Sequence, residues 1–370
     1  MFLSSLFHKL NYRMPGRSYY LETDAEQRIA LGRIYSSVSD ASQPWPSGTR
    51  VSDMREFTFD CVAVDDQNAR HPVLRMCYLD YAGELLECEQ PGGTALKDLA
   101  GQIETAHALL GMIDGHRVLQ LLRGQRAGHV HFQQTLQPMF GFMQGASCPI
   151  HLVLTKWDLV RDFGEPDDAD DQYRLDRVIE ALLKFEHIRS LVYVHSKHQV
   201  VRLIPVSAVG SDFVHLNADG TMSKLPDGEL RPTNVHVPLC AALPDLFKQV
   251  ERTLDQSTLR DLNTAMHRNI RGDMAAIVAA ALGRPAAAVA RTVLQGALGR
   301  GYGLEATSLF MEWMARPLDE KGKRMAQTRN AVEREVAERQ RLRGIVMDDF
   351  NRTVLKLEAI LPQSELSRNW

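Results

Sequence analysis

Three short motifs of acidic, basic and small residues each follow an apolar, strand-like run of this 370-residue chain. They are Asp80–Gly83 (DYAG), Thr155–Asp158 (TKWD) and Ser207–Gly210 (SAVG). The carboxyl ends of parallel strands meet at one edge of an open α/β sheet, and ligands bind at that edge. We therefore expect the three motifs to come together in one site.

The first motif combines a carboxylate with a glycine three residues later. At a strand end, the Asp80 carboxylate is suited to hold Mg²⁺ directly or through water. Gly83 lets a backbone N–H approach a terminal phosphate closely, because glycine has no Cβ. The same residues are also typical of an ordinary strand-to-turn connection, so the motif alone leaves both interpretations open.

The second motif offers a carboxylate that suits one purine edge. Asp158 can accept two hydrogen bonds from the ring N–H and the exocyclic amine of guanine, whereas adenine presents the opposite polarity. The aliphatic stem of Lys156 can lie over the base while its ammonium stays in water. Thr155 opens the motif and is included in the predicted base site. The alternative is a surface Lys/Asp pair after a buried strand.

The third motif places small residues directly after the apolar run 201–205. A small residue such as Ala208 lets its own N–H reach the carbonyl oxygen of guanine. Ser207 belongs to the same predicted turn. Small residues after a strand are common, however, so an ordinary turn remains the alternative.

In this order and at these strand ends, the motifs resemble those of P-loop GTPases of the TRAFAC clade. The chain is most similar to the bacterial double-GTPase family, through the loop Pro44–Thr49 (PWPSGT) and the stretch Asn234–Pro238 (NVHVP). The resemblance covers about residues 1–256. It implies GTP and GDP as ligands, Mg²⁺ as cofactor, and a molecular switch that hydrolyses GTP.

The resemblance also implies two segments that order on the γ-phosphate. Thr49 is the candidate switch threonine, which would contact Mg²⁺ and the γ-phosphate; an ordinary loop threonine is the alternative. The second segment follows Asp80 and includes Gly83. Glu84 stands where many small GTPases place the glutamine that orients the attacking water. Because a carboxylate adds negative charge beside a developing anion, we expect slow hydrolysis or a need for a group from elsewhere.

The phosphate-binding loop GxxxxGK[ST] of these proteins is absent from the chain. Leu3, Leu6, Phe7 and Leu10 form one stripe of an amphipathic helix, which resembles the helix that follows this loop. Without the loop, most phosphate affinity should vanish. One interpretation is a shortened chain or a wrongly assigned start. The other is a degenerate GTPase fold that acts as an inactive scaffold.

Alternating strands and helices predict an α/β fold of the three-layer, P-loop-NTPase-like (Ras-like) type. We expect a mostly parallel sheet with one antiparallel edge strand, because two strand-like segments are joined by the hairpin-like 65–72. The predicted strands are 56–64, 73–80, 118–122, 150–154 and 201–205, with one or two hairpins in 213–237. The predicted helices are 1–10, 96–110, 132–143, 172–189 and the chain from 238 to the end.

The chain divides into a GTPase-like domain, 1–256, and an all-helical C-terminal region, 257–370. The apolar stretch 274–298 is interrupted by Arg284, Pro285 and Arg291, so we predict core packing and no membrane span, with a membrane-touching helix as the alternative. The helical region is the expected contact for a partner, such as a second GTPase.

Composition excludes several other classes of protein. Hydrophobic residues make up 44% and charged residues 24%, which excludes a wholly disordered chain. The net charge of −3 gives no general attraction to nucleic acid or to anionic membranes. The five cysteines lack metal-binding spacing and are predicted to be reduced thiols of a cytoplasmic protein.

Overall fold

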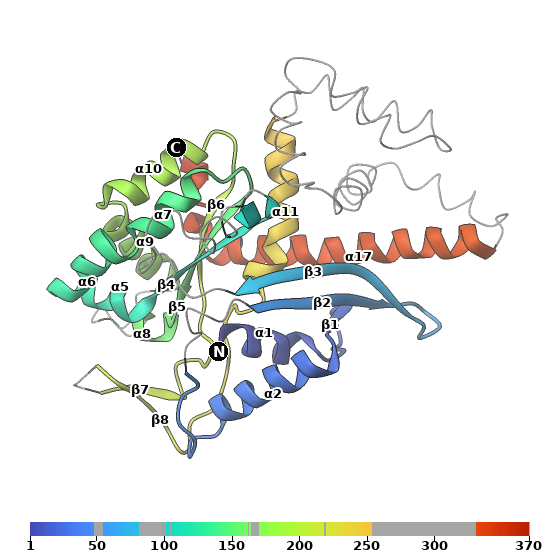
Figure 1. Ribbon diagram of the computed structural model, residues 1–370, viewed down its shortest axis with the longest axis horizontal. Coiled ribbons are helices and arrows are strands. Elements are labelled where there is room, and N and C mark those ends of the chain that lie inside the picture. Colours follow the sequence, from blue (N-terminus) through green and yellow to red (C-terminus); the bar gives the residue numbers. More distant parts are fainter. Residues whose placement is uncertain are drawn as a thin grey trace.

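The structure is a computed structural model that describes residues 1–47, 55–80, 99, 101–103, 105–161, 163, 170–217, 220–253 and 331–369. It has a mixed α/β fold with a small parallel sheet, two antiparallel sheets and surrounding helices (Figure 1). No helix among the described residues is long and apolar enough to cross a membrane. The segment 274–298 lies outside these residues.

The first helix, α1 (Phe2–Leu10), follows the predicted stripe. Leu3, Leu6, Phe7 and Leu10 are all buried. The Phe7 ring stacks on Phe59 with the ring centroids 5.8 Å apart. The period of 3.6 residues therefore predicted both the helix and its core-facing side.

Three antiparallel strands form the sheet beside α1, in the order β1 (Tyr19–Glu22), β2 (Arg55–Val64) and β3 (Arg70–Asp80). The predicted hairpin between β2 and β3 is confirmed. Its turn is closed by the Asp65 side chain, which accepts hydrogen bonds from the N–H groups of Gln67 and Ala69.

The parallel sheet has the order β4 (Leu109–Asp114), β5 (Ile150–Thr155) and β6 (Val201–Pro205). Every residue of β6 and all but the last of β5 are buried. A continuous apolar run is typical of a strand that is covered on both faces, which is why β5 and β6 were both predicted correctly.

Several predictions about the elements are wrong. Hydrogen bonding divides β1 to β6 into two three-stranded sheets, and three of these six strands are antiparallel, where one antiparallel edge strand was expected. The run 118–122 lies in helix α5 (Gly115–Leu122), and the strand is the preceding β4. The predicted helix 172–189 is two helices, α9 (Asp171–Leu182) and α10 (Glu186–His195).

The other described elements complete the chain between these strands. They are α2 (Ala25–Ser39), α6 (Arg126–Val130), the π-helical turn η1 (His131–Thr135), α7 (Gln137–Gln144), α8 (Trp157–Arg161), the hairpin β7 (Val214–Leu216) and β8 (Met222–Lys224), and α11 (Val237–Thr253).

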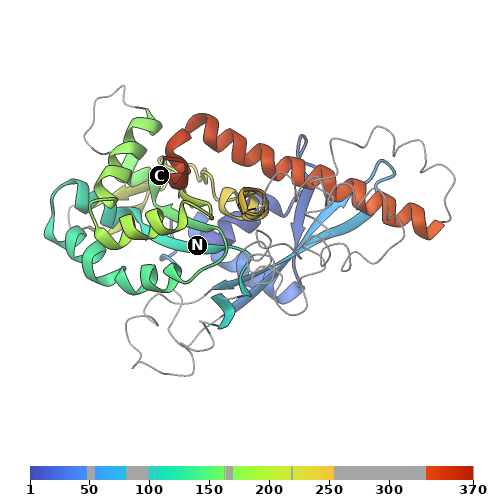
Figure 2. The same cartoon turned by 90° about the horizontal axis from the view of Figure 1, so that it is seen from above.

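The C-terminal part consists of α17 (Ala331–Ile360) and two short 3-10 turns, η4 (Pro362–Ser364) and η5 (Leu366–Asn369). Helix α17 packs against α11, β3 and β2, and Figure 2 shows it crossing the molecule from the parallel sheet to the antiparallel one. The predicted domain boundary at 256/257 lies outside the described residues and stays a prediction.

A group of charged side chains joins the parallel sheet to α11 and α17. Arg202 of β6 is 0% exposed and donates to both carboxylate oxygens of Asp245, at 2.6 and 2.8 Å. It also donates to Glu358 of α17 at 3.0 Å. Burial alone would lower the pKa of Arg202, but the carboxylates of Asp245 and Glu358 outweigh burial and raise it.

The residues after α17 cover the outer side of β6. Glu365 forms an antiparallel β-bridge with Arg202, and the Ser367 hydroxyl accepts a hydrogen bond from the Val201 N–H. Lys248 donates to Glu365 at 2.7 Å. The end of the chain is therefore part of the same packed unit as the parallel sheet.

Four of the five cysteines lie in the described residues, and all four are free thiols. Cys61, Cys148 and Cys240 are buried, while Cys77 is exposed. Burial raises the pKa of Cys148 and of Cys240 to about 12, so both thiols stay protonated at neutral pH. Cys88 lies outside the described residues.

Candidate functional site

The second and third motifs lie side by side at the carboxyl ends of β5 and β6. The Val206 N–H donates to Leu154 O at 2.7 Å, and the Trp157 N–H donates to Val206 O at 3.1 Å. These bonds extend the parallel pairing beyond the strands and bring Thr155–Asp158 against the turn that starts at Ser207. The expected convergence of these two motifs is therefore observed.

The turn after β5 is held by its neighbour β4. Lys156 has a φ of 52°, and its ammonium lies 3.0 Å from the carboxylate of Asp114, the last residue of β4. The Thr155 hydroxyl donates to Ile113 O at 3.0 Å. A Cβ at Gly115 would lie 2.2 Å from Thr155 O, so only glycine permits this close approach. Sequence reasoning missed Asp114 and Gly115, although an Asp-Gly pair after an apolar run was visible.

Asp158 lies in the first turn of the short helix α8. The residue is 6% exposed, and its neighbour Trp157 is 3% exposed. A carboxylate in such surroundings is shielded from bulk water, so its hydrogen bonds are stronger than those of a surface carboxylate.

The turn after β6 is closed by its own serine. The Ser207 hydroxyl accepts hydrogen bonds from the N–H groups of Gly210, at 2.7 Å, and Val209, at 3.3 Å. Gly210 has a φ of 88°, and a Cβ there would lie 2.5 Å from Arg231 O. Ser207 thus shapes the turn.

Ala208 is half-buried at the tip of this turn. Its carbonyl oxygen accepts a hydrogen bond from the Ser5 hydroxyl of α1 at 3.0 Å. Among the hydrogen bonds of the described residues, none uses the Ala208 N–H. This N–H is therefore a donor at the place where the sequence predicted one.

The first turn of α1 connects the third motif with the first. Ser5 contacts Ala208. The Met1 amino group interacts electrostatically with the carboxylate of Asp80, the last residue of β3. Burial lowers the pKa of this amino group, and the Asp80 carboxylate partly offsets the effect. Asp80 and the turn after β6 thus both lie near the first turn of α1.

Three of the predicted site residues, Thr49, Gly83 and Glu84, lie outside the described residues. Of the residues predicted to bind the metal and the phosphates, the structure describes only Asp80. Among the residues that the structure describes, no group of three or more His, Cys, Asp or Glu side chains is arranged around a metal. A single carboxylate nevertheless suits Mg²⁺, which keeps several waters and takes one or two protein carboxylates.

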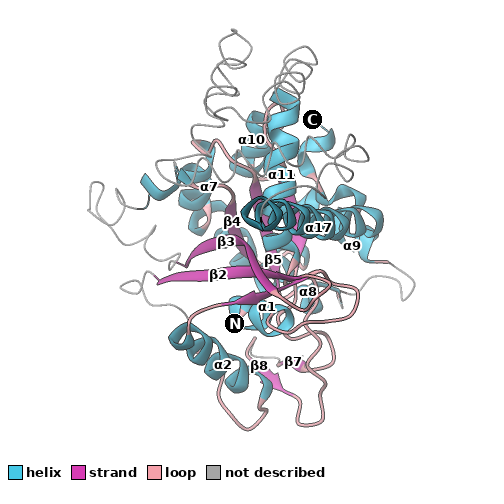
Figure 3. Ribbon diagram, turned by 90° about the vertical axis from the view of Figure 1, so that its right-hand side faces the viewer, coloured by secondary structure: helices cyan, strands magenta, loops and turns pink. Residues whose placement is uncertain are grey.

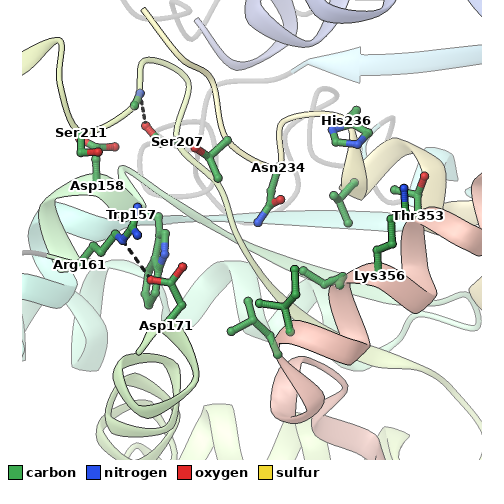
Figure 4. Close-up of a pocket in the computed structure, with 16 residues that line it drawn as sticks. Trp157, Asp158, Arg161, Asp171, Ser207, Ser211, Asn234, His236, Thr353 and Lys356 are labelled. Atoms are coloured by element: carbon green, nitrogen blue, oxygen red, sulfur yellow. Dashed lines mark hydrogen bonds and ion pairs between the residues drawn. The ribbon is translucent and has the colours of Figure 1, made fainter. Parts of the chain in front are cut away.

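A cavity of about 340 Å³ lies beside the two turns (Figure 4). Asp158 and Ser207 line one end, and Thr353 and Lys356 of α17 line the other. Lys156 and Ala208 are not part of its wall, so the cavity adjoins the predicted base site without containing it.

His236 also lines this cavity, at the start of α11. Burial, together with the positive charges of Lys9 and Arg17, lowers the pKa of His236 to about 3. The imidazole is therefore neutral at physiological pH, and its Nδ1 is buried with no hydrogen-bond partner in the described part of the chain.

Comparison with protein-family models, with curated proteins and with solved structures finds no match to this chain. The site is therefore interpreted from its own geometry and chemistry.

Proposed function

We propose that the protein is a guanine-nucleotide-binding switch of the GTPase type, with Mg²⁺ as cofactor and GTP or GDP as ligand. The fold would be the Ras-like, three-layer P-loop-NTPase type, with the two three-stranded sheets as its parts. The observation that carries the proposal is the pairing of the turn that leads to Asp158 with the turn that carries Ala208. The first turn of α1 adjoins this pair through the Ser5–Ala208 hydrogen bond, and the charge of Asp80 acts on its Met1 amino group.

In this proposal the turns after β5 and β6 select the base. Asp158 accepts hydrogen bonds from the ring N–H and the exocyclic amine of guanine, and the Ala208 N–H donates to its carbonyl oxygen. Lys156 is held by Asp114, so its stem is ordered before a base arrives. Thr155 and Ser207 support the two turns through the bonds to Ile113 and within the SAVG turn.

The phosphate part of the proposed site depends on Asp80 and on three residues outside the described part. Asp80 and Thr49 would hold Mg²⁺, Gly83 would approach the γ-phosphate, and Glu84 would stand beside the attacking water. Mg²⁺ would supply positive charge against the phosphates. Since GxxxxGK[ST] is absent, we expect weak phosphate binding and weak or no hydrolysis by this chain.

The proposal extends to the cellular setting. We propose a cytoplasmic protein that acts on neither nucleic acid nor membranes, in line with its small net charge. The helical C-terminal region would contact a partner protein, such as a second GTPase.

A second candidate is an inactive scaffold with a GTPase-like fold. It is favoured by apolar side chains that α17 leaves exposed, namely Ile345, Leu355 and Ile360, at 37%, 55% and 64%. Nucleotide binding separates the two candidates, because a scaffold needs no base selectivity.

The test compares guanosine with adenosine as ligands of the full chain, by ligand-observed NMR titration. Nucleosides are chosen because they probe the base site without the phosphate loop. We expect guanosine to bind at least about tenfold more tightly, since one matched set of base hydrogen bonds is worth roughly 1–3 kcal/mol. Equal affinities, or none for either nucleoside at millimolar concentration, would exclude the proposed base recognition.

The matched variants are Asp158→Ala and Asp212→Ala. Asp212 is an exposed carboxylate just beyond the SAVG turn. We expect Asp158→Ala to abolish the preference for guanosine and Asp212→Ala to preserve it, with thermal unfolding of both variants checked alongside.

A further inference from the structure

Lys224, the last residue of β8, binds the segment that follows α2. Its ammonium donates to three backbone carbonyls, those of Ser37, Asp40 and Gln43, the last two at 2.9 Å. A lysine ammonium has three hydrogens, so the three acceptors use its full donor capacity. The partners are the last carbonyls of a helix and its exit loop, where a positive charge is favourable.

Trp45 completes this contact from the other side. The Lys224 ammonium lies 4.6 Å from the centroid of the Trp45 ring, within the range of a cation–π interaction. The indole N–H of Trp45 donates to Met222 O at 2.8 Å. Each of the loop 40–47 and the hairpin β7–β8 therefore donates a hydrogen bond to the other. Figure 3 shows the hairpin beside α2.

A small apolar cluster links this contact to the turn after β6. Its buried members are Val38 of α2, Val209 of the SAVG turn, and Phe213 just before β7. Trp45 packs against the same cluster. Val209 directly follows Ala208, so the residue whose N–H is the proposed base donor is covalently joined to the cluster.

We infer that Lys224 and Trp45 are positioning residues, which hold the loop 40–47 against the turn 207–210 so that the two respond to a bound base as one unit. This inference rests on the proposed function, because the ligand is taken to be a guanine nucleoside at Asp158 and Ala208. The inference gives the hairpin β7–β8 a role in the site, although the hairpin contains none of the three motifs.

The physical reason is the distribution of acceptors around Lys224. Its three carbonyl partners belong to one segment, while the lysine belongs to another, so the segments separate only if all three bonds break. Burial lowers the pKa of Lys224, while the charge of Asp40 acts in the opposite direction. The cost of removing the ammonium from water is therefore offset only while the loop stays in contact.

The test measures backbone hydrogen exchange of the full chain, with and without guanosine. In the wild type we expect guanosine to slow exchange in peptides covering both 155–160 and 36–47. The second peptide holds none of the proposed base contacts, so its protection reports the coupling and not contact with the ligand.

Two variants and one control complete the experiment. Lys224→Met keeps the length of the side chain but removes its donors, and Trp45→Phe keeps the ring but removes the N–H. In Lys224→Met, we expect exchange in 36–47 without ligand to become about tenfold faster, because a charged hydrogen bond contributes a factor of about ten or more. In Trp45→Phe we expect a smaller increase of about fivefold, because the lost hydrogen bond is neutral. Guanosine should no longer protect 36–47 but should still protect 155–160. Lys224→Arg should restore the protection in part.

The control is Lys197→Met. Lys197 also lies over an aromatic ring, at 5.8 Å from the centroid of Tyr193, but it is an exposed residue just after the end of α10. We expect this variant to behave as the wild type.

The outcomes separate the inference from the function on which it rests. Protection of 155–160 without any protection of 36–47 in the wild type overturns the inference and leaves base recognition standing. Retention of the 36–47 protection in Lys224→Met overturns it as well. If guanosine protects neither peptide in the wild type, the proposed function fails, and the inference with it.

Discussion

Asp158 owes its place in the proposed site to the polarity of its hydrogen bonds. A carboxylate offers two acceptors, whereas the amide of asparagine offers one acceptor and one donor. Asp158→Asn should therefore lose guanosine and gain xanthosine, which carries a carbonyl oxygen where guanosine carries its exocyclic amine. We expect a drop of about tenfold or more for guanosine and a reversal of the preference, measured by NMR titration of both nucleosides.

The matched control for this substitution is Asp212→Asn, which makes the same chemical change at an exposed position outside the two turns. Its nucleoside preference should equal that of the wild type. Loss of guanosine binding by Asp158→Asn without any gain for xanthosine would contradict the assigned hydrogen bonds.

His236 makes stability depend on pH in a defined direction. Its folded-state pKa is lowered to about 3 from an ordinary value of 6.5. Between these values the unfolded chain binds a proton that the folded chain does not, so stability falls as the pH falls from 6.5 towards 3. Replacing His236 by glutamine removes this proton linkage.

We expect the wild type to lose about 2 kcal/mol more stability than His236→Gln between pH 8 and pH 5. The measurement is urea unfolding of both proteins at several pH values, and its result is the difference between the two curves. Parallel curves would mean that His236 is accessible to protons in the folded protein.

At this scale the sequence predicted the placement of residues well where the pattern is local. Each of the two motifs, at Asp158 and at Ala208, is a contiguous run of residues. Residue types and their order were therefore enough to predict that the two motifs lie close together. His236 and Lys224 were missed because their roles come from contacts between elements far apart in the chain. Charge and burial at such contacts leave no local pattern in a single sequence.

At the scale of elements, periodicity succeeded where a segment has one clear face. Helix α1 and strands β5 and β6 were predicted because their burial follows one simple rule. Helix α5 was mistaken for a strand, because a short apolar run such as 118–122 fits either a buried helix or a buried strand. Helix α2 buries only Leu31 and Val38 and gave no recognisable apolar stripe.

The start of α5 allows a sharp test of how elements hold the site. In Gly115→Ala, the new Cβ would lie 2.2 Å from Thr155 O and 2.8 Å from Lys156 O, so the helix and the TKWD turn must separate. We expect a loss of roughly 1–3 kcal/mol of stability, as for overpacked cores, together with weaker guanosine binding. Urea unfolding and nucleoside titration measure the two effects.

Gly141→Ala is the control for this change. Gly141 lies in helix α7, and no atom lies within 4 Å of a Cβ built there. We expect this variant to gain about 0.5–1 kcal/mol, because alanine loses less backbone entropy in a helix. Equal effects of the two substitutions would show that the close approach at Gly115 does not exist in solution.

At the scale of the whole molecule, α17 and the buried ion pairs unite the C-terminal part with both sheets. Arg202 keeps Asp245 as a partner when Glu358 is neutralised, so Glu358→Gln weakens the contact of α17 without leaving the arginine alone. We expect a loss of about 1.5–3 kcal/mol, the range for a hydrogen bond to a charged group, in a single urea transition.

Arg352→Gln is the control on the same helix. Arg352 is 57% exposed and pairs with Asp349 at 2.8 Å, so its loss should cost about 0–1 kcal/mol, as is usual for surface pairs. Two separate transitions, or equal losses in the two variants, would contradict a single cooperative unit. The sequence predicted that this region is helical, but its contacts with both sheets involve residues more than a hundred positions apart and could not be read from it.

The β-bridge between Glu365 and Arg202 has a consequence for the behaviour of the protein at high concentration. Strand β6 is the outermost of its sheet, and a bare outer strand offers its backbone as a template for strands of other molecules. Glu365 and Ser367 cover this edge and so prevent it from pairing with strands of other molecules. We therefore expect that removal of the last ten residues causes the protein to aggregate.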